Sequence, residues 1–215
     1  EVKQFTLESV NARETSYRHG VTKKFNILDL YSENIVNKFA SIGKGIKVVV
    51  DSGNATGGIV APDLYRELGC EVIELFSEPD GTFPNHHPNP SDEKTLDAIK
   101  KKVIEEKADL GIAFDGDSDR IGVIDSSGNS LTGDKLLLIY AMDVIEQLAK
   151  RGEKPTIVSE VKCSQVLYDT IDENGGKAVM CKTGHGYIKS KMKEVNAILA
   201  VSYTHLRAHE TGAYL

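Results

Sequence analysis

The sequence predicts an α/β protein with two successive domains, the second of them short. Two observations support this prediction. Short runs rich in β-branched residues, such as "IKVVV" and "TIVSEV", are bounded by turn residues, as buried strands are. Between them lie longer segments whose apolar residues recur every three or four positions, which is the spacing of one helix face. Strands that alternate with helices indicate parallel pairs joined by right-handed crossovers.

The first series of elements follows residues 1–24, which are polar and are expected to be a connecting segment. Pro62 opens a helix that Gly69 can close. The other expected elements, in chain order, are a helix at 26–39 lying on a sheet, strands at 46–50 and 70–76, a long surface loop at 77–92, a helix capped by Ser91 with the buried stripe Leu96, Ile99, Val103 and Ile104, strands at 108–114 and 120–125, a turn at 126–129, and a helix at 136–148.

The second series begins after "KRGEKP" (150–155), which has the composition of a linker. It alternates strands and helices in the same way as the first series. The expected elements are a strand at 156–161, a helix around 166–171, a strand at 177–181, a helix around 187–195 and a strand at 197–200.

The composition narrows the functional class. Of 215 residues, 40% are hydrophobic and 27% charged, which suits a globular protein with a sizeable core. With 26 basic and 32 acidic residues the net charge is −6, so we expect neither a nucleic-acid nor a membrane partner. No apolar run is long enough to span a bilayer and no signal core is present, which favours a cytoplasmic protein. Cys70, Cys163 and Cys181 are widely spaced and are interpreted as reduced thiols.

Residues 115–120, "DGDSDR", place three aspartates at alternate positions directly after an apolar strand. Carboxylates confined to one loop repel one another unless a cation neutralises them. Oxygen ligands without neighbouring His or Cys favour a hard ion such as Mg²⁺. Asp115, Asp117 and Asp119 are therefore candidate metal ligands. Gly116 is expected to ease the fold of the backbone around the ion, and Arg120 offers a donor fork that suits a phosphate.

Three other interpretations of this loop compete with a metal site. An EF-hand also begins D-x-D-x-D, but it needs Gly at its sixth position and an acid at its twelfth, where this chain has Arg120 and Ser126. A polar turn without a ligand is compatible with the composition, because Asp and Gly are common in turns. A non-catalytic, metal-stabilised binding module also stays open on spacing alone.

Five motifs together resemble the α-D-phosphohexomutases, in the order of the phosphomannomutase/phosphoglucomutase branch. They are "DSGNATGG", "DGTFPNHHPNP", "ADLGIAFDGDSDR", "EVKCS" and "KTGHGYIKSKMKE". The resemblance implies mixed-sheet, three-layer domains, one complete and one truncated. It maps residues 1–24 onto the tail of a missing first domain, 25–150 onto the second of four domains, and 153–200 onto the N-terminal part of the third.

The resemblance also implies roles. Asp115, Asp117 and Asp119 match the three protein ligands of Mg²⁺, and Arg120 matches a residue that contacts the phosphate. Lys162, Gly184 and His185 match positions that face the cleft and bind the sugar phosphate, with charge stabilisation expected from Lys162 and sugar-phosphate contact or help with proton transfer from His185. The implied substrates are mannose or glucose phosphates, interconverted between their 1- and 6-forms through a hexose 1,6-bisphosphate intermediate. Phosphoglucosamine mutase is the alternative within the family, disfavoured by "GTFPNHHPNP".

Some features depart from the family pattern. Ser118 stands where the family usually has glycine, and would be strained if that position requires a positive φ. "NHHPNP" superficially resembles the family's T-A-S-H-N-P phosphoserine loop, but no serine precedes His87, so no nucleophile is assigned. His86 and His87 are interpreted as structural, because adjacent side chains rarely point to one ion.

The last residues, 201–215, are expected to be foreign to the family. "VSYTHLRAHET" (201–211) resembles the translation of a sequencing-transposon adapter, so we interpret this tail as an artefact of library preparation and assign no metal role to His205 and His209. A missing starting methionine and the missing phosphoserine loop lead us to expect a fragment that is inactive by itself and whose parent is an enzyme.

Overall fold

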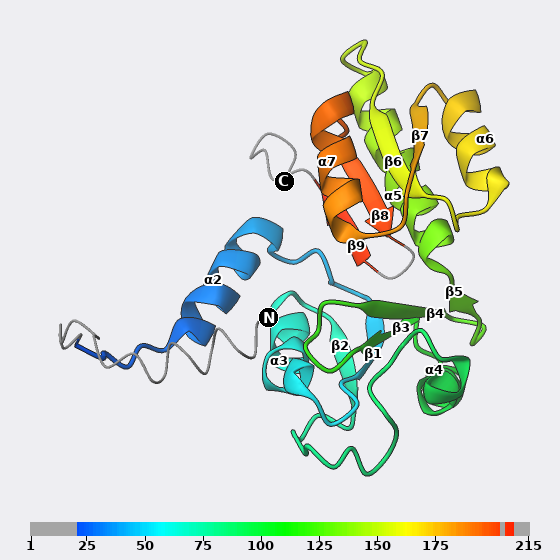
Figure 1. Ribbon diagram of the computed structural model, residues 1–215. Helices are drawn as coiled ribbons and strands as arrows, with labels where there is room; N and C mark the ends of the chain where they lie inside the picture. Colours follow the sequence, from blue (N-terminus) through cyan, green and yellow to red (C-terminus); the bar gives the residue numbers. More distant parts are fainter. Residues whose placement is uncertain (1–20, 203–204, 209–215) are drawn as a thin grey trace, which may run out of the picture.

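The computed structural model describes residues 21–202 and 205–208, which form two α/β units, each built around one sheet (Figure 1). Residues 1–20 of the expected connecting segment lie outside the described residues. So do residues 203–204 and 209–215 of the expected adapter-derived tail.

The first sheet has five strands in the spatial order β2-β1-β3-β4-β5. β1 pairs in parallel with β2 and with β3, whereas β4 runs antiparallel to β3 and β5 antiparallel to β4. The strands are β1 (Lys47–Asp51), β2 (Glu71–Leu75), β3 (Leu110–Phe114), β4 (Ile121–Asp125) and β5 (Ser130–Leu131). The expected parallel pairing of the first two strands is confirmed, and the sheet is mixed.

Helices cover both faces of this sheet. Side chains alternate between the faces of a strand, so that Val48 and Val50 pack on one side and Val49 on the other. The first side meets α3 (Ala61–Glu67), and the second meets α4 (Asp97–Glu106). Short 3₁₀ turns precede both helices, η1 (Thr56–Ile59) and η2 (Glu93–Leu96). The three layers expected for this domain are therefore present.

Three expectations about the helices are wrong. The first helix, α2 (Ile27–Phe39), has no buried residue and lies against α3 rather than on a sheet, because α3 and α4 already cover the two faces. Asp92, and not Ser91, caps the 3₁₀ turn η2 that leads into α4, since its carboxylate accepts from the backbone N–H of Lys94; α4 itself has no side-chain cap. Of the expected buried stripe on α4, Ile104 is exposed.

The second sheet has four strands in the order β7-β6-β8-β9, with β6 parallel to β7 and β8 and with β9 antiparallel to β8. One face packs against α5 and α6, and the other against α7. The elements are α5 (Gly133–Ala149), β6 (Thr156–Glu160), α6 (Gln165–Glu173), β7 (Lys177–Cys181), α7 (His185–Val195), β8 (Leu199–Ser202) and β9 (His205–Ala208).

Helix α5 belongs by packing to the second unit. Its buried residues Leu137, Ala141 and Ile145 share one hydrophobic cluster with Ile157 of β6 and Leu199 of β8. The boundary expected between residues 150 and 153 stays a prediction, and this packing favours an earlier one, close to the start of α5. None of the described helices combines the length and the apolar character that crossing a membrane requires.

Candidate functional site

The connection between β3 and β4 brings three carboxylates together. Asp115 directly follows the buried strand β3 and is only 2% exposed, whereas Asp117 and Asp119 are exposed. One oxygen from each side chain lies within 4.8 Å of the others. Among the described residues, this is the group of three that could hold a metal ion. The expected position of the loop between two strands is confirmed, and the three side chains converge.

Arg120 fixes the orientation of Asp115. Its backbone N–H donates to Oδ1 of Asp115 at 2.9 Å, and its Nε donates to Oδ2 at 2.7 Å. Burial opposes ionisation of Asp115, but these hydrogen bonds and the charge of Arg120 outweigh it and hold the pKa of the carboxyl below its usual range. Arg120 Nε also lies 3.9 Å from Oδ1 of Asp119. The arginine is thus part of the carboxylate loop itself.

The backbone of the loop turns at Ser118. This residue has a φ of +61°, so the strain expected for a serine at a glycine position is present. The Ser118 hydroxyl lies over Gly57, where an added Cβ would come within 2.9 Å of it. Gly116, in contrast, has no positive φ, and a Cβ there would meet only Pro88, at 3.8 Å. The expectation that Gly116 eases the turn is therefore wrong. Ser118 is the residue of this loop that adopts the positive φ.

The donor set fits a hard divalent cation. All three side chains offer carboxylate oxygens, which Mg²⁺ and Ca²⁺ prefer over nitrogen or sulfur. Each oxygen of Asp115 accepts one hydrogen bond from Arg120 and has a second lone pair for an ion. Two further aspartates at the exposed rim can complete a partial shell that leaves positions for water or phosphate oxygens.

A long loop, residues 76–92, packs behind this site and supplies residues that are not among the predicted site residues. The Nη1 of Arg120 donates to Oδ1 of Asn89 at 3.2 Å. His86 lies against Asp51, which is the last residue of β1 and is 1% exposed. Asp51 could have been noticed in the sequence, because ligand sites in α/β proteins lie at the carboxyl ends of strands. Its contact with His86 has no local sequence signal.

The other predicted site residues lie on the second unit. Lys162 is exposed in the turn after β6. Gly184 precedes α7 with a φ of +126°, a conformation that favours glycine, and His185 is the exposed first residue of that helix. The distances given above connect Arg120 with two of the three aspartates of the carboxylate loop. The association of Lys162, Gly184 and His185 with that loop stays a prediction.

Fold and site together define a class of α/β proteins that carry a carboxylate loop at the carboxyl end of a sheet strand. Residues 29–128 match the model described as phosphoglucomutase/phosphomannomutase, alpha/beta/alpha domain II, and residues 132–203 match domain III of the same family. The chain belongs to the phosphoglucomutase/phosphomannomutase family.

Individual relatives agree with this membership. A phosphomannomutase/phosphoglucomutase of Pseudomonas putida is 44% identical over 197 residues, which is 92% of this chain and 42% of the relative. The crystal structure of a family protein from Burkholderia thailandensis superposes with a TM-score of 0.84 at 36% identity and covers 97% of this chain and 44% of that one. The chain thus spans less than half the length of these relatives.

A more distant structure shares the fold. N-acetylphosphoglucosamine mutase of Aspergillus fumigatus, solved in complex with GlcNAc-6P and magnesium, has a TM-score of 0.60 at 18% identity. It covers 82% of this chain and 36% of that one.

Proposed function

We propose that this chain supplies the Mg²⁺-binding loop and part of the sugar-phosphate cleft of a phosphohexomutase. The reaction is the interconversion of the 1- and 6-phosphates of mannose or glucose, through a hexose 1,6-bisphosphate. The observation that carries the proposal is the convergence of Asp115, Asp117 and Asp119 within 4.8 Å, in a chain that belongs to this family. Because these substrates are intracellular phosphate esters, we place the protein in the cytoplasm.

The proposed roles follow from the side-chain chemistry. Asp115, Asp117 and Asp119 hold Mg²⁺, which supplies Lewis-acid polarisation of a phosphoryl oxygen when it is bound. Arg120 uses Nε to hold Asp115 and has further N–H groups that can donate to a phosphate. Lys162 places a positive charge near the cleft to offset charge on the transferring group. No nucleophile is assigned to this chain.

The N-terminus of α7 is the proposed site for the sugar phosphate. The first turn of a helix presents backbone N–H groups that suit an anion. Gly184 allows the chain to enter this turn with a positive φ, and His185 stands at its first position, where it can contact the phosphate or move a proton. The magnesium and the GlcNAc-6P in the Aspergillus structure support the same ligand classes for this chain.

A chimeric enzyme tests the proposed reaction. Residues 25–200 replace the matching segment of the Pseudomonas putida relative, and conversion of glucose 1-phosphate to glucose 6-phosphate is followed with Mg²⁺ and glucose 1,6-bisphosphate present. We expect turnover that depends on Mg²⁺. A folded chimera that binds Mg²⁺ and hexose phosphate without turnover would instead indicate a binding module.

The metal assignment is tested on the chain itself by calorimetry. Asp115→Asn should weaken Mg²⁺ binding more than about 100-fold, because the buried ligand loses its charge. Glu105→Gln removes one negative charge from the exposed surface of α4 and serves as the matched control. Equal Mg²⁺ affinity of the two variants would exclude Asp115 as a ligand.

A further inference from the structure

The side chains of Asp51 and His86, which lie 35 positions apart in the sequence, contact each other at the end of β1. His86 Nε2 is 3.0 Å from Oδ2 and 3.2 Å from Oδ1 of Asp51, and its Nδ1 is 3.1 Å from the carbonyl oxygen of His87. Both ring nitrogens therefore face acceptors. A neutral imidazole has one donor only, so the geometry fits the imidazolium, in which both nitrogens donate.

This pair anchors the middle of the 76–92 loop to the end of β1. Oδ1 of Asp51 also accepts from the backbone N–H of Gly53, which fixes the carboxylate to the turn after the strand. Next to the pair, Asn85 donates through its side chain to Oδ1 of Asn54 at 2.7 Å. The His86 ring meets the ring of Phe76 edge to face, with centroids 5.3 Å apart. The loop is thus held to the glycine-rich turn at several points.

From this anchor, the loop reaches the carboxylate site. Pro88 packs between the two loops, since Cβ atoms added to Gly53 and Gly116 would meet it at 2.9 and 3.8 Å. Asn89 then accepts from Arg120, and Arg120 in turn holds both oxygens of Asp115. Hydrogen bonds of known length thus lie at both ends of this path, between Asp51 and His86 and from Asn89 through Arg120 to Asp115.

A purely structural role for the pair predicts something different from a positioning role. If Asp51 and His86 only stabilise the fold, their loss lowers the folded fraction and affects every ligand alike. If they aim the carboxylate loop, their loss affects most the ion that tolerates distortion least. Mg²⁺ requires nearly ideal octahedral geometry, whereas Ca²⁺ accepts flexible shells of six to eight oxygens.

We propose that Asp51, His86 and Asn89 are positioning residues that hold Arg120 and Asp115 in the geometry that selects Mg²⁺ over Ca²⁺. The Asp51–His86 ion pair fixes the loop, and Asn89 transmits that position to the arginine. This inference rests on the proposed function in one respect, that the carboxylate loop binds a divalent cation.

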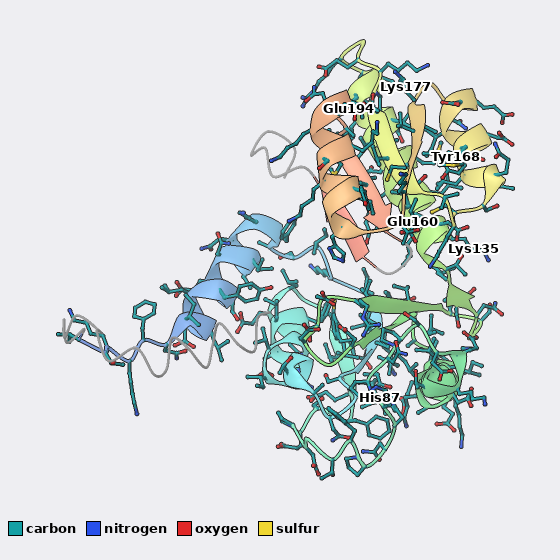
Figure 2. The ribbon with its side chains drawn as sticks, in the orientation of Figure 1. His87, Lys135, Glu160, Tyr168, Lys177 and Glu194 are labelled. Carbon is teal, nitrogen blue, oxygen red and sulfur yellow. The ribbon has the colours of Figure 1, made fainter. Side chains whose placement is uncertain are left out.

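The test compares Mg²⁺ and Ca²⁺ affinities of the chain by calorimetry, in His86→Ala and in the matched control His87→Ala. His87 is exposed in the same loop of the first unit (Figure 2). Its ring meets the ring of Phe83 edge to face, with centroids 5.9 Å apart. We expect His86→Ala to lower the Mg²⁺ affinity about 3–10-fold more than the Ca²⁺ affinity, below the 10–100-fold typical of a ligand's direct partner. His87→Ala should leave the ratio of the two affinities unchanged.

Asn89→Ala provides a second variant, since it removes the acceptor for Arg120 and leaves the buried ion pair in place. It should shift the Mg²⁺/Ca²⁺ ratio in the same direction, which keeps the test decisive if His86→Ala does not fold. Equal losses for both ions, or an unchanged ratio in both variants, overturn the positioning role while the metal site stands. A wild-type chain that binds neither ion contradicts the proposed function itself, and the positioning role with it.

Discussion

The two units share a topology over four strands each but differ in the length of one connection. In both, the central strand pairs in parallel with two neighbours, and an antiparallel strand follows, in the orders β2-β1-β3-β4 and β7-β6-β8-β9. In both, a buried acidic residue that is 1% exposed ends the central strand, Asp51 in the first unit and Glu160 in the second. The connections that differ follow the neighbouring strands. The connection from β2 to η2 comprises residues 76–92, whereas the equivalent connection from β7 to α7 comprises only residues 182–184.

This difference indicates what a site needs beyond its fold. In the first unit the long connection returns to the end of the central strand and packs His86 against Asp51. In the second unit, the neighbouring helix contacts the backbone at this position: the Tyr168 hydroxyl of α6 donates to the main-chain carbonyl oxygen of Glu160 at 3.0 Å (Figure 2). In the first unit, the carboxylate loop therefore lies beside a long loop that is fixed at the end of the central strand.

The largest expected effect comes from emptying the core of one unit. Ile99 of α4 is fully buried, so Ile99→Ala should lower the free energy of unfolding by about 2–4 kcal/mol. Ile104→Ala on the same helix is the control, because this side chain is 57% exposed and its loss should cost less than about 0.5 kcal/mol. Urea denaturation measures both variants.

Hydrogen exchange on the same variants shows whether the two units unfold separately. Independent units predict that Ile99→Ala reduces protection in β1 and β3 and leaves β6 and β8 unchanged. A uniform loss of protection in both sheets would show that the two units unfold together as one cooperative unit.

The next effect concerns the ion pair and depends on pH. The hydrogen bond to Asp51 is the main cause that raises the pKa of His86, against the opposing effect of burial. A raised folded pKa means that the stabilisation is complete below the unfolded value of about 6.5 and is lost as the pH rises through the folded pKa. His86→Ala should cost about 2 kcal/mol at pH 6 and less at pH 8.5.

Thermal or urea unfolding of wild type and His86→Ala across this pH range measures the difference. His87→Ala, the neighbouring exposed histidine, should show no such trend. If the loss of unfolding free energy in His86→Ala grows with pH, the charged pairing of His86 with Asp51 is contradicted.

A smaller effect separates two glycines at the start of α7. Gly184 has a φ of +126°, so Gly184→Ala should destabilise the second unit by about 1–2 kcal/mol. Gly186 lies inside the helix with open space around it, so Gly186→Ala should stabilise by about 0.5 kcal/mol. Chemical denaturation measures the change in unfolding free energy for both variants. Changes of opposite sign would support the backbone conformation given for the start of α7, and changes of the same sign would refute it.

Sequence reasoning recovered the parts of the molecule that depend on local pattern. β-branched strands and glycine-rich turns predicted both series of α/β elements, and the spacing of Asp115, Asp117 and Asp119 predicted their convergence. The exposed position of α2 was missed, because its periodicity reveals an apolar face but not whether a sheet face is available for it.

The supporting contacts of the site could not be predicted in the same way. His86 and Asp51 meet across 35 positions, and Asn89 meets Arg120 across 31. No local propensity encodes such pairs, which depend on how a loop without regular structure folds back over a turn. "NHHPNP" was noticed in the sequence, but the partner of its first histidine is visible only in three dimensions.

The smallest effect tests the strain inside the carboxylate loop. Ser118 adopts a φ of +61°, which costs a non-glycine residue about 1–2 kcal/mol. Ser118→Gly removes this strain and so raises the free energy of unfolding. About 0.4–1 kcal/mol of that increase is cancelled, because glycine gives the unfolded chain more conformational entropy. We therefore expect a net stabilisation of about 0.5 kcal/mol without metal, measured by urea denaturation in EDTA.

Gly116→Ala, two positions earlier and free of positive φ, is the control and should not destabilise the protein. If Ser118→Gly destabilises the chain, then the contact of the serine hydroxyl above Gly57 matters more than the backbone strain, and the turn is held by its side chain.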